Sequence, residues 1–387
     1  MSKMIPLSVP NFEGNEEKYV LDAVSQGWVS TGGAYVEKLE QIIGGYCKTP
    51  DAVACQSGTA ALHMALIECG VGKDDMVIVP TLTFIAAVNP VTYVNAEPIF
   101  MDCDDSLCID PLKLEQFCEE ECEMTKHGLR HKDSGKIVKA IIVVHVFGNL
   151  ADMESIMSIA ERYNLKVIED ATEALGSYYE SGKYSGRMAG SIGDLGAFSF
   201  NGNKIITTGG GGMIVSKNQK ALKHLKYLST QAKDDPHFYI HNEIGYNYRM
   251  TNVQAAIGVA QMEELEEFIR RKNRNYNLYC KLLAYSERGY ILPFREGTRS
   301  NKWFYSFVFK HGGEEMDVRK CIEKLQFEGI QTRPIWGLIH KQKPYRGTLS
   351  YNIEKAKYYS DRIINLPCST NITEENIRIV CDAIERL

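Results

Sequence analysis

Short apolar runs alternate with helical patterns between residues 50 and 215, and this alternation constrains the fold more than any other feature. Strands alternating with helices predict an α/β fold with a mainly parallel sheet. The predicted strands lie at 53–55, 76–80, 98–102, 138–144, 166–170, 197–200 and 213–215. The predicted helices between them lie at 60–68, 83–94 and 152–163.

The pattern changes after residue 216, where a smaller α+β part is expected. A long charge-rich helical pattern covers 252–283, and a helix is predicted at 373–387. Apolar runs follow the long helix at 304–309 and around 330–335. A domain boundary is therefore predicted near residue 250. Residues 118–136 are polar and irregular and are predicted to form an inserted loop.

The charge and the cysteine usage limit which partners and which cellular compartment the sequence predicts. The chain has 44 basic and 49 acidic residues, a net charge of −5 without long runs of one sign, which argues against nucleic-acid binding through a basic surface. Eleven irregularly spaced cysteines favour free thiols in a reduced compartment. The start of the sequence lacks a signal-peptide core, and the most apolar run, 140–144, is too short to cross a bilayer. We therefore expect a soluble cytoplasmic protein with no membrane contact.

Two residues stand out as candidates for catalysis. Lys204 lies between short apolar runs and before four glycines, Gly209 to Gly212. A lysine amine forms Schiff bases readily once its site lowers its pKa. Asp170 ends an apolar strand, where open α/β sheets place their ligands. Each has an ordinary alternative, because a lysine can precede a glycine turn on the surface and an aspartate can cap the next helix.

A third motif, Ser57-Gly58-Thr59, lies at a strand-to-helix turn. The start of a helix presents free N–H groups and partial positive charge, so it suits a phosphate, although simple capping explains the motif equally. The stretch from Gly245 to Ala256 leads into the long helix. The sequence has no Gly-x-Gly-x-x-Gly and no P-loop signature, which disfavours a nicotinamide oxidoreductase.

Taken together, these motifs resemble the nucleotide-sugar aminotransferases of the DegT/DnrJ/EryC1/StrS group, which are fold-type-I pyridoxal-phosphate (PLP) enzymes. The resemblance runs from residue 5 to residue 387 and includes 27–32, 80–84, 332–336 and 340–345. Residues 144–149 and the inserted loop look most like aminotransferases of legionaminic-acid-type biosynthesis. The resemblance implies a large PLP-binding domain at 1–250, with a mainly parallel mixed sheet between helices. It also implies a small C-terminal α+β domain at 251–387, joined by an N-terminal arm at 1–14.

The resemblance implies a role for each catalytic candidate. Lys204 would bond to the cofactor aldehyde and later move the proton at the amine-bearing carbon. Asp170 would pair with the pyridine nitrogen and keep it protonated, so that the ring accepts electrons. Glutamate would donate the amino group, and the keto carbon of a nucleotide-linked deoxysugar would receive it. C4 of a 4-keto-6-deoxyhexose is the expected acceptor, and C3 of a 3-keto sugar is the alternative that the sequence leaves open. Such products serve the biosynthesis of amino or sialic-acid-like surface sugars.

The resemblance also implies cofactor contacts. Glu173 would lie near the ring hydroxyl, where many relatives carry glutamine; a carboxylate there is repelled unless one group holds a proton. Asn247 would reach the phosphate of the neighbouring subunit's cofactor, which implies an obligate homodimer with shared sites. Phe84 would lie against the ring face. The phosphate would be held by Ser57, Gly58, Thr59 and Ser199.

Four residues are candidates for substrate binding: Trp28, Ser30, Arg333 and His340. A planar arginine fork can hold a carboxylate or phosphate with two bonds. The alternatives are a structural ion pair or loop anchor for Arg333 and His340, and a core or interface role for Trp28.

The sequence leaves two alternative functions open and contains one set of residues that resembles a metal site. The nearest rival is a sugar dehydratase of the same family, which usually has histidine in place of Lys204. A non-catalytic PLP-binding regulator is the other, and loss of Lys204 or Asp170 would favour it. Cys118, Cys122, His127 and His131 resemble a zinc set, but only four residues separate the two pairs, so no metal site is predicted.

Overall fold

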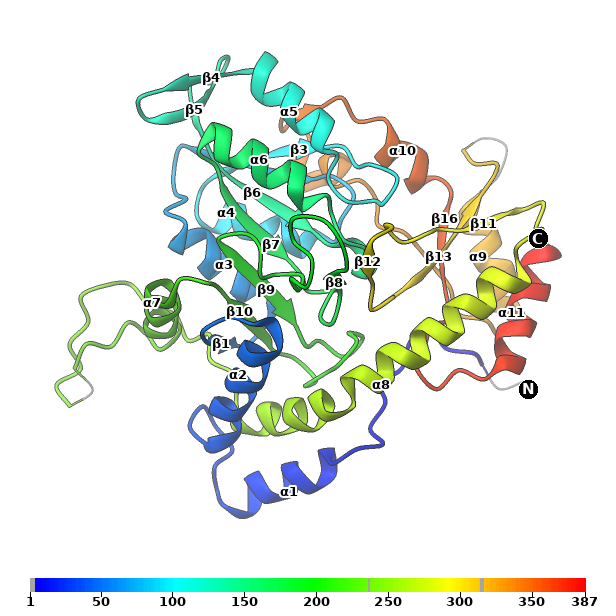
Figure 1. Ribbon diagram of the computed structural model, residues 1–387, viewed down its shortest axis with the longest axis horizontal. Coiled ribbons are helices and arrows are strands. Elements are labelled where there is room, and N and C mark those ends of the chain that lie inside the picture. The colour runs from blue at the N-terminus through cyan, green and yellow to red at the C-terminus, as the bar shows by residue number, and fades with distance from the viewer. Residues whose placement is uncertain (1–3, 236, 314–316) are drawn as a thin grey trace.

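The computed structural model describes residues 4–235, 237–313 and 317–387, and a ten-stranded mixed sheet lies at its centre (Figure 1). The strand order is β1-β10-β9-β7-β6-β2-β3-β15, with β10 antiparallel to both of its neighbours. A hairpin of β4 and β5 joins at β6. The strands are β1 (Ala52–Cys55), β2 (Asp75–Pro80), β3 (Glu97–Met101), β4 (Cys122–Thr125), β5 (Gly128–His131), β6 (Ile137–Val144), β7 (Lys166–Asp170), β9 (Leu195–Ser199), β10 (Gly212–Val215) and β15 (Ser350–Tyr351).

Helices cover both faces of this sheet, because right-handed crossovers between parallel strands place successive helices on the side that the direction of winding dictates. The chain winds outward from β1 to β3 through α3 and α4, and winds back from β3 to β7 through α5 and α6 (Figure 1). β6 is buried from 140 to 144, as expected for a strand covered on both faces. The helices are α2 (Ala34–Cys47), α3 (Gly58–Glu68), α4 (Asn89–Tyr93), α5 (Pro111–Glu120), α6 (Met153–Tyr163) and α7 (Gln219–Ser229).

A second sheet is built from the later part of the chain, in the order β11-β13-β16-β14 with antiparallel pairing. The long helix α8 begins with a capping box of Thr251 and Gln254 and runs from α2 to α11 (Figure 1). The elements are α8 (Asn252–Leu282), β11 (Gly289–Ile291), β13 (Tyr305–Phe309), α9 (Val318–Phe327), β14 (Arg333–Pro334), α10 (Lys355–Ser360), β16 (Ile363–Leu366) and α11 (Glu374–Glu385). Short elements are β8 (Tyr178–Tyr179), β12 (Thr298–Arg299), η1 (Ile85–Ala87), η2 (Val146–Gly148), η3 (Ile339–Lys341) and η4 (Lys343–Tyr345).

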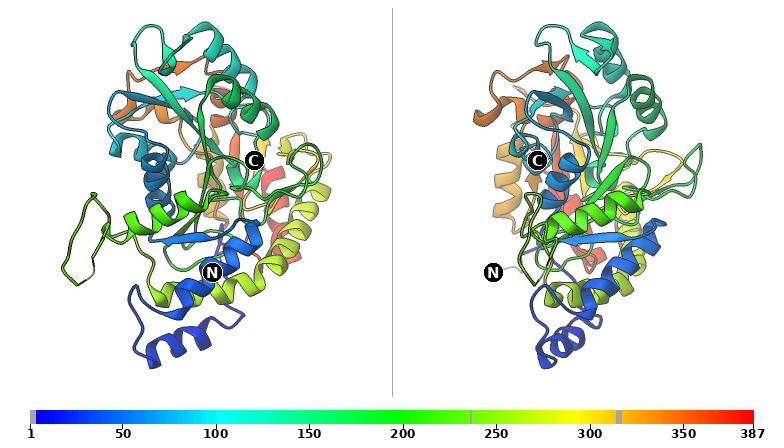
Figure 2. Two further views of the ribbon diagram at one scale, coloured as in Figure 1. Left: turned by 60° about the vertical axis from the view of Figure 1, so that its left-hand side comes forward. Right: turned by 90° about the vertical axis from the view of Figure 1, so that its left-hand side faces the viewer.

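The N-terminal segment lies against the second sheet. Ile5 forms a parallel bridge with Ile330, and the Leu7 carbonyl accepts a bond of 2.7 Å from the Cys368 N–H. α1 (Glu16–Ser25) then packs along α8. Conversely, a segment from the later part of the chain joins the large sheet, where β15 pairs in parallel with β3. Figure 1 and the left view of Figure 2 show the segment after α7 extending from the body of the molecule.

The α/β fold class is confirmed, but two local predictions are wrong. Residues 118–136 hold the end of α5 and the β4–β5 hairpin instead of an irregular loop. Leu129 and His131 are buried while Arg130 between them is exposed, so β5 has one inward face despite its polar composition. Its partner is β6, a pairing that the local sequence does not reveal. The helix predicted at 83–94 is two short pieces, η1 and α4, and the second has Pro90 in its first turn.

All eleven cysteines are free thiols, and all but Cys280 are buried. Within the described ranges no helix is both long and apolar enough to cross a membrane. Over the same residues, no three or more of His, Cys, Asp and Glu are grouped in a way that could hold a metal ion.

Candidate active site

The carboxyl ends of the parallel strands meet at one edge of the large sheet, and several predicted site residues lie there. Asp170 ends β7 and Ser199 ends the neighbouring β9. Ser57 follows β1, which runs in the same direction beyond β10. This is the edge at which open α/β sheets bind ligands.

The start of α3 is held close to the ends of β7 and β9. Ser57 is its N-cap, and its hydroxyl accepts a bond of 3.1 Å from the backbone N–H three residues on. A Cβ on Gly58 would lie 2.9 Å from both the Ser199 Cβ and the Thr172 Cγ2, so a larger residue would push these elements apart. The first-turn N–H groups, with Thr59 among them, therefore lie beside the Ser199 side chain and form a suitable anion site.

The glycines after Lys204 allow a second close approach. Gly211 has φ +126° and forms a parallel bridge with Ser57. A Cβ on Gly212 would lie 2.5 Å from the Ser57 carbonyl carbon. The glycine run thus lets β10 press against the turn that begins α3.

The Lys204 amine lies between a carboxylate and an indole. Its side chain is 13% exposed, and its Nζ lies 3.4 Å from Glu173 Oε1. The same Nζ lies 4.1 Å from the centroid of the Trp303 ring. A loop that begins at Phe200, directly after β9, carries the lysine back over the carboxyl edge of the sheet.

Asp170 and Glu173 are both 4% exposed, and burial raises the pKa of each. For Glu173, burial outweighs the attraction of Lys204 and raises the pKa to about 7. Its Oε2 accepts a bond of 2.8 Å from the Phe147 N–H. Asp170 accepts one of 3.1 Å from the Thr172 N–H, and Lys204 again opposes the shift. Two buried acids therefore face one amine, and the pair can accept a further proton or cation.

Four other predicted residues lie on exposed segments. The Phe84 side chain is exposed just beyond β2. Asn247 is exposed, and Tyr248 beside it accepts a backbone bond of 2.8 Å from the N–H of Gln56, which precedes the α3 cap. The Trp28 and Ser30 side chains are exposed, while the carbonyls of both residues accept bonds of 2.6 Å from Asn252.

The two remaining candidates differ in how they are held. His340 Nδ1 lies 2.6 Å from the hydroxyl of Thr81, which directly follows β2 and so lies at the same sheet edge. Burial, with Lys341 nearby, lowers the pKa of His340 and favours the neutral ring. Arg333 is exposed and donates to the Thr332 carbonyl at 2.9 Å.

Sequence reasoning missed two residues from the second half of the chain, Trp303 beside the Lys204 amine and Asn301 behind Glu173. Trp303 covers the amine, and Phe147 packs between Trp303 and Trp336, with centroids 6.0 and 4.7 Å away. Asn301 is buried and donates to the carbonyls of Glu173 and Leu175. The available signal was weak, because Trp303 simply precedes an apolar run typical of a core strand.

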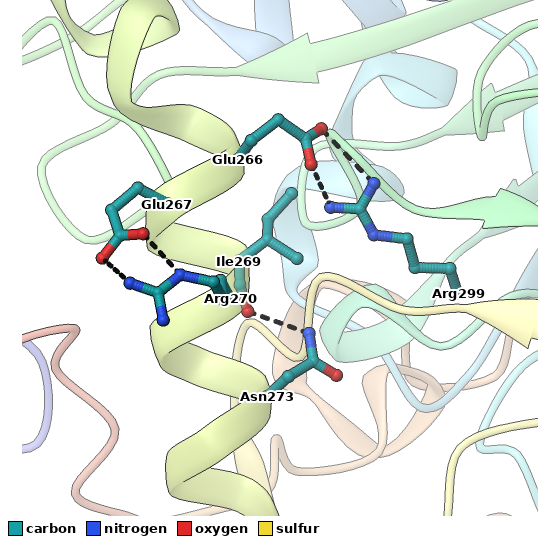
Figure 3. A pocket seen from close by; sticks show the side chains of 6 residues that line it. All are labelled: Glu266, Glu267, Ile269, Arg270, Asn273 and Arg299. Carbon is teal, nitrogen blue, oxygen red and sulfur yellow. Dashed lines mark hydrogen bonds and ion pairs between the residues drawn. The ribbon is translucent and has the colours of Figure 1, made fainter.

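A separate surface pocket lies between α8 and Arg299, and none of the predicted site residues lines it (Figure 3). Its charged side chains are paired with one another. Glu266 bonds Arg299, and Glu267 bonds Arg270 through two contacts of 2.6 and 2.7 Å. Their charges are therefore already balanced within the chain.

Comparison with known proteins agrees with this geometry. The model of the DegT/DnrJ/EryC1/StrS aminotransferase family matches residues 10–385. The chain belongs to this family. It is 36% identical to a GDP-perosamine synthase of Caulobacter vibrioides, across 99% of this chain and 98% of the relative. A crystal structure of a family aminotransferase from Brucella abortus has a TM-score of 0.86 and 27% identity, covering 96% of this chain and 95% of that one.

A Streptococcus pneumoniae protein assigned as a sugar aminotransferase has been solved in its PLP form. Its TM-score is 0.87 and its identity 25%, over 99% of this chain and 98% of that one. The present chain is an aminotransferase, and its cofactor is PLP. Its residues fit that cofactor: the start of α3 suits the phosphate, and Lys204 suits the aldehyde. The buried carboxyl group of Asp170, whose pKa is raised, suits the positive charge of a protonated ring nitrogen.

Proposed function

We propose that this family member transfers an amino group from glutamate to C4 of a nucleotide-linked 4-keto-6-deoxyhexose. The observation that carries the proposal is the buried amine of Lys204, which lies 3.4 Å from Glu173 at the sheet edge that also holds Asp170. The similarity to a GDP-perosamine synthase supports a sugar nucleotide as the acceptor.

Each site residue has a proposed part in the reaction. PLP, when bound, supplies an aldehyde that takes up the amino group and a ring that accepts electrons. The α3 start and Ser199 hold the phosphate, and Asp170 keeps the proton on the ring nitrogen. Lys204 takes and returns the proton at the amine-bearing carbon. Glu173, whose pKa of about 7 leaves it largely protonated below neutral pH, can donate its proton toward the ring hydroxyl oxygen.

The exposed candidates are proposed to bind substrate. The Arg333 fork suits a carboxylate of glutamate or a phosphate of the sugar nucleotide. His340 lies at the same sheet edge as Asp170 through its contact with Thr81. Trp28 and Ser30, next to the start of α8, complete the proposed set, and Phe84 is proposed to cover the cofactor ring. The product is proposed to be an amino sugar for surface glycans, and the resemblance of residues 144–149 to legionaminic-type enzymes supports this proposal.

The proposed assembly is an obligate homodimer with shared sites. The segment after α7 exposes large apolar side chains, with Phe238 and Ile244 at 79% and 85% exposure. Asn247 follows on the same segment, which suits a contact with the neighbouring subunit's cofactor phosphate. Sedimentation should give a dimer, and mixing Lys204→Ala with Asn247→Ala should restore partial activity. A fully active monomer would contradict this proposal.

The proposed domain division keeps the boundary near residue 250. The contacts of Ile5 with Ile330 and of Leu7 with Cys368 support assigning the N-terminal arm to the second part.

The free thiols support a cytoplasmic location.

The test uses purified protein loaded with PLP, glutamate and a panel of UDP-, GDP- and dTDP-linked 4-keto and 3-keto sugars. The expected product has the mass of an amine in place of the ketone, and Lys204→Ala should neither form it nor give a borohydride-trapped cofactor on that peptide. A product that has lost water would favour the dehydratase. Cofactor binding without any turnover would favour a regulator.

A further inference from the structure

We propose that Trp303 is a positioning residue for Lys204: its ring holds the amine in place and its N–H fixes the backbone beside it. The inference rests on the proposed function only in taking Lys204 as the reacting amine. Trp303 lies about a hundred residues from Lys204 in the sequence, so the fold alone brings the two together.

Two contacts join Trp303 to the lysine segment. The Lys204 Nζ lies 4.1 Å from the ring centroid, a distance at which the face of an indole attracts an ammonium group. The indole Nε1–H donates a bond of 2.7 Å to the carbonyl of Asn203, the residue before Lys204. One side chain therefore fixes both ends of the lysine, its backbone and its amine.

Trp303 is itself tied to the residues that carry Glu173. Its backbone N–H donates to the Asn301 side chain at 3.0 Å and to the Phe147 carbonyl at 3.1 Å. Asn301 in turn donates to the Glu173 carbonyl at 2.9 Å, and the Phe147 N–H donates to the Glu173 carboxylate at 2.8 Å. The indole and the carboxylate that flank the amine thus belong to one hydrogen-bonded unit.

A second lysine anchors this unit from behind. Lys272 of α8 is fully buried, and its amine donates bonds of 2.7 Å to the carbonyls of Trp303 and Cys368. Placing an amine in the core is costly, and burial lowers the pKa of Lys272. Its two bonds tie α8 to the Trp303 segment and to the residues just after β16. They therefore hold Trp303 in place and offset part of the cost of burying the amine.

The consequence concerns Lys204 when its amine is free. A lysine stem has four flexible carbons, so a free amine samples many positions unless something confines it. The Trp303 face and Glu173 confine it to one place. Proton transfer then starts from a fixed geometry, which affects the chemical step more than substrate affinity.

The test compares Trp303→Leu, Trp303→Phe and a control, Trp336→Phe, which changes the same aromatic cluster through its contact with Phe147. In cofactor-free protein, acetylation of Lys204 by acetic anhydride is followed by mass spectrometry against other lysines. Trp303→Leu should speed this reaction by about 3- to 30-fold, and the control should not. An unchanged rate in Trp303→Leu would overturn the inference.

A kinetic readout separates positioning from simple packing. Trp303→Leu should lower kcat by about 3- to 30-fold with little change in KM for glutamate, and should raise the isotope effect with glutamate deuterated at C2. A rise in KM alone would overturn the inference. If Trp303→Leu does not fold, Trp303→Phe decides: loss of the bond to Asn203 should slow trapping of PLP on Lys204, and a wild-type rate overturns the inference. Failure of the wild-type protein to bind PLP would refute the proposed function, while the acetylation result would still decide the placement.

Discussion

Glu169 and Asp170 are neighbours in β7 and both are buried, yet their pKa values shift in opposite directions. Burial raises the pKa of Glu169, but hydrogen bonds from His145 and from backbone N–H groups outweigh it and lower the pKa. Burial also raises the pKa of Asp170, and the bonds from Thr172 do not offset it. Adjacent side chains of a strand point to opposite faces, so the two acids meet different surroundings.

The difference lies in how completely each carboxylate is bonded. Glu169 accepts from the backbone N–H groups of Gly190, Ile192 and Gly193 at 2.6 to 2.8 Å, and from His145 Nε2 at 2.9 Å. His145 donates through Nε2 because its Nδ1 accepts from a backbone N–H at 3.2 Å. Asp170 faces the site with a backbone bond from Thr172. A fully bonded acid holds the structure, whereas an incompletely bonded one retains capacity for a ligand.

The largest expected effect is on folding, through Glu169→Gln. An amide nitrogen would face backbone N–H donors and the charge would be lost, so the free energy of unfolding should fall by about 3–5 kcal/mol at pH 8. Because the folded pKa of Glu169 is lowered, this deficit should shrink as the pH falls through that pKa. Urea unfolding of cofactor-free protein measures it. Equal stability at pH 8 would show that Glu169 is not a structural acid.

Asp170→Asn should lower turnover and leave the stability of the fold intact, the reverse of the effect expected for Glu169→Gln. Asparagine keeps an oxygen for the Thr172 N–H but cannot hold a charge against the ring nitrogen, so turnover should fall by about 100- to 1,000-fold. Because the folded pKa of Asp170 is raised, ionising it costs stability as the pH rises, and the variant should be at least as stable as wild type at pH 8. Near-normal turnover would remove the proposed role, and a large loss of stability would make Asp170 resemble Glu169.

Sequence reasoning found the α/β fold because its strands are continuous apolar runs. Each predicted strand of the large sheet is present within two residues of its expected ends, and α8 covers all but one residue of the predicted 252–283. The hairpin at 122–131 was missed because its stability comes from pairing with β6, a contact between separate parts of the chain. α1 and α2 were not predicted either, and both pack on the distant α8.

In the candidate site too, residues in local motifs could be predicted, whereas residues placed by distant contacts could not. Ser57, Asp170 and Lys204 could be chosen because each follows or ends a strand in a recognisable motif. Asn301 and Trp303 could not, because nothing near them in the sequence indicates that they contact residues 173 and 204. The difference between Glu169 and Asp170 was equally hidden, since it depends on the loop at 190–193 that folds over β7.

The smallest expected effect belongs to Glu173, which lies between the two cases, bonded to the Phe147 N–H and to the Lys204 amine. Its pKa rises from 4.5 to about 7 on folding, so the folded state holds its proton over a range in which the unfolded state has lost it. As the pH rises from about 4.5 to about 7, the free energy of unfolding of wild type should therefore fall by about 3 kcal/mol relative to that of Glu173→Gln. Above pH 7 this gap between the two proteins should stay constant. Urea unfolding of the cofactor-free proteins from pH 4.5 to pH 8 measures the gap. Glutamine should also retain turnover, since it mimics the protonated acid; parallel stability curves would show that Glu173 is ionised throughout, as Glu169 is.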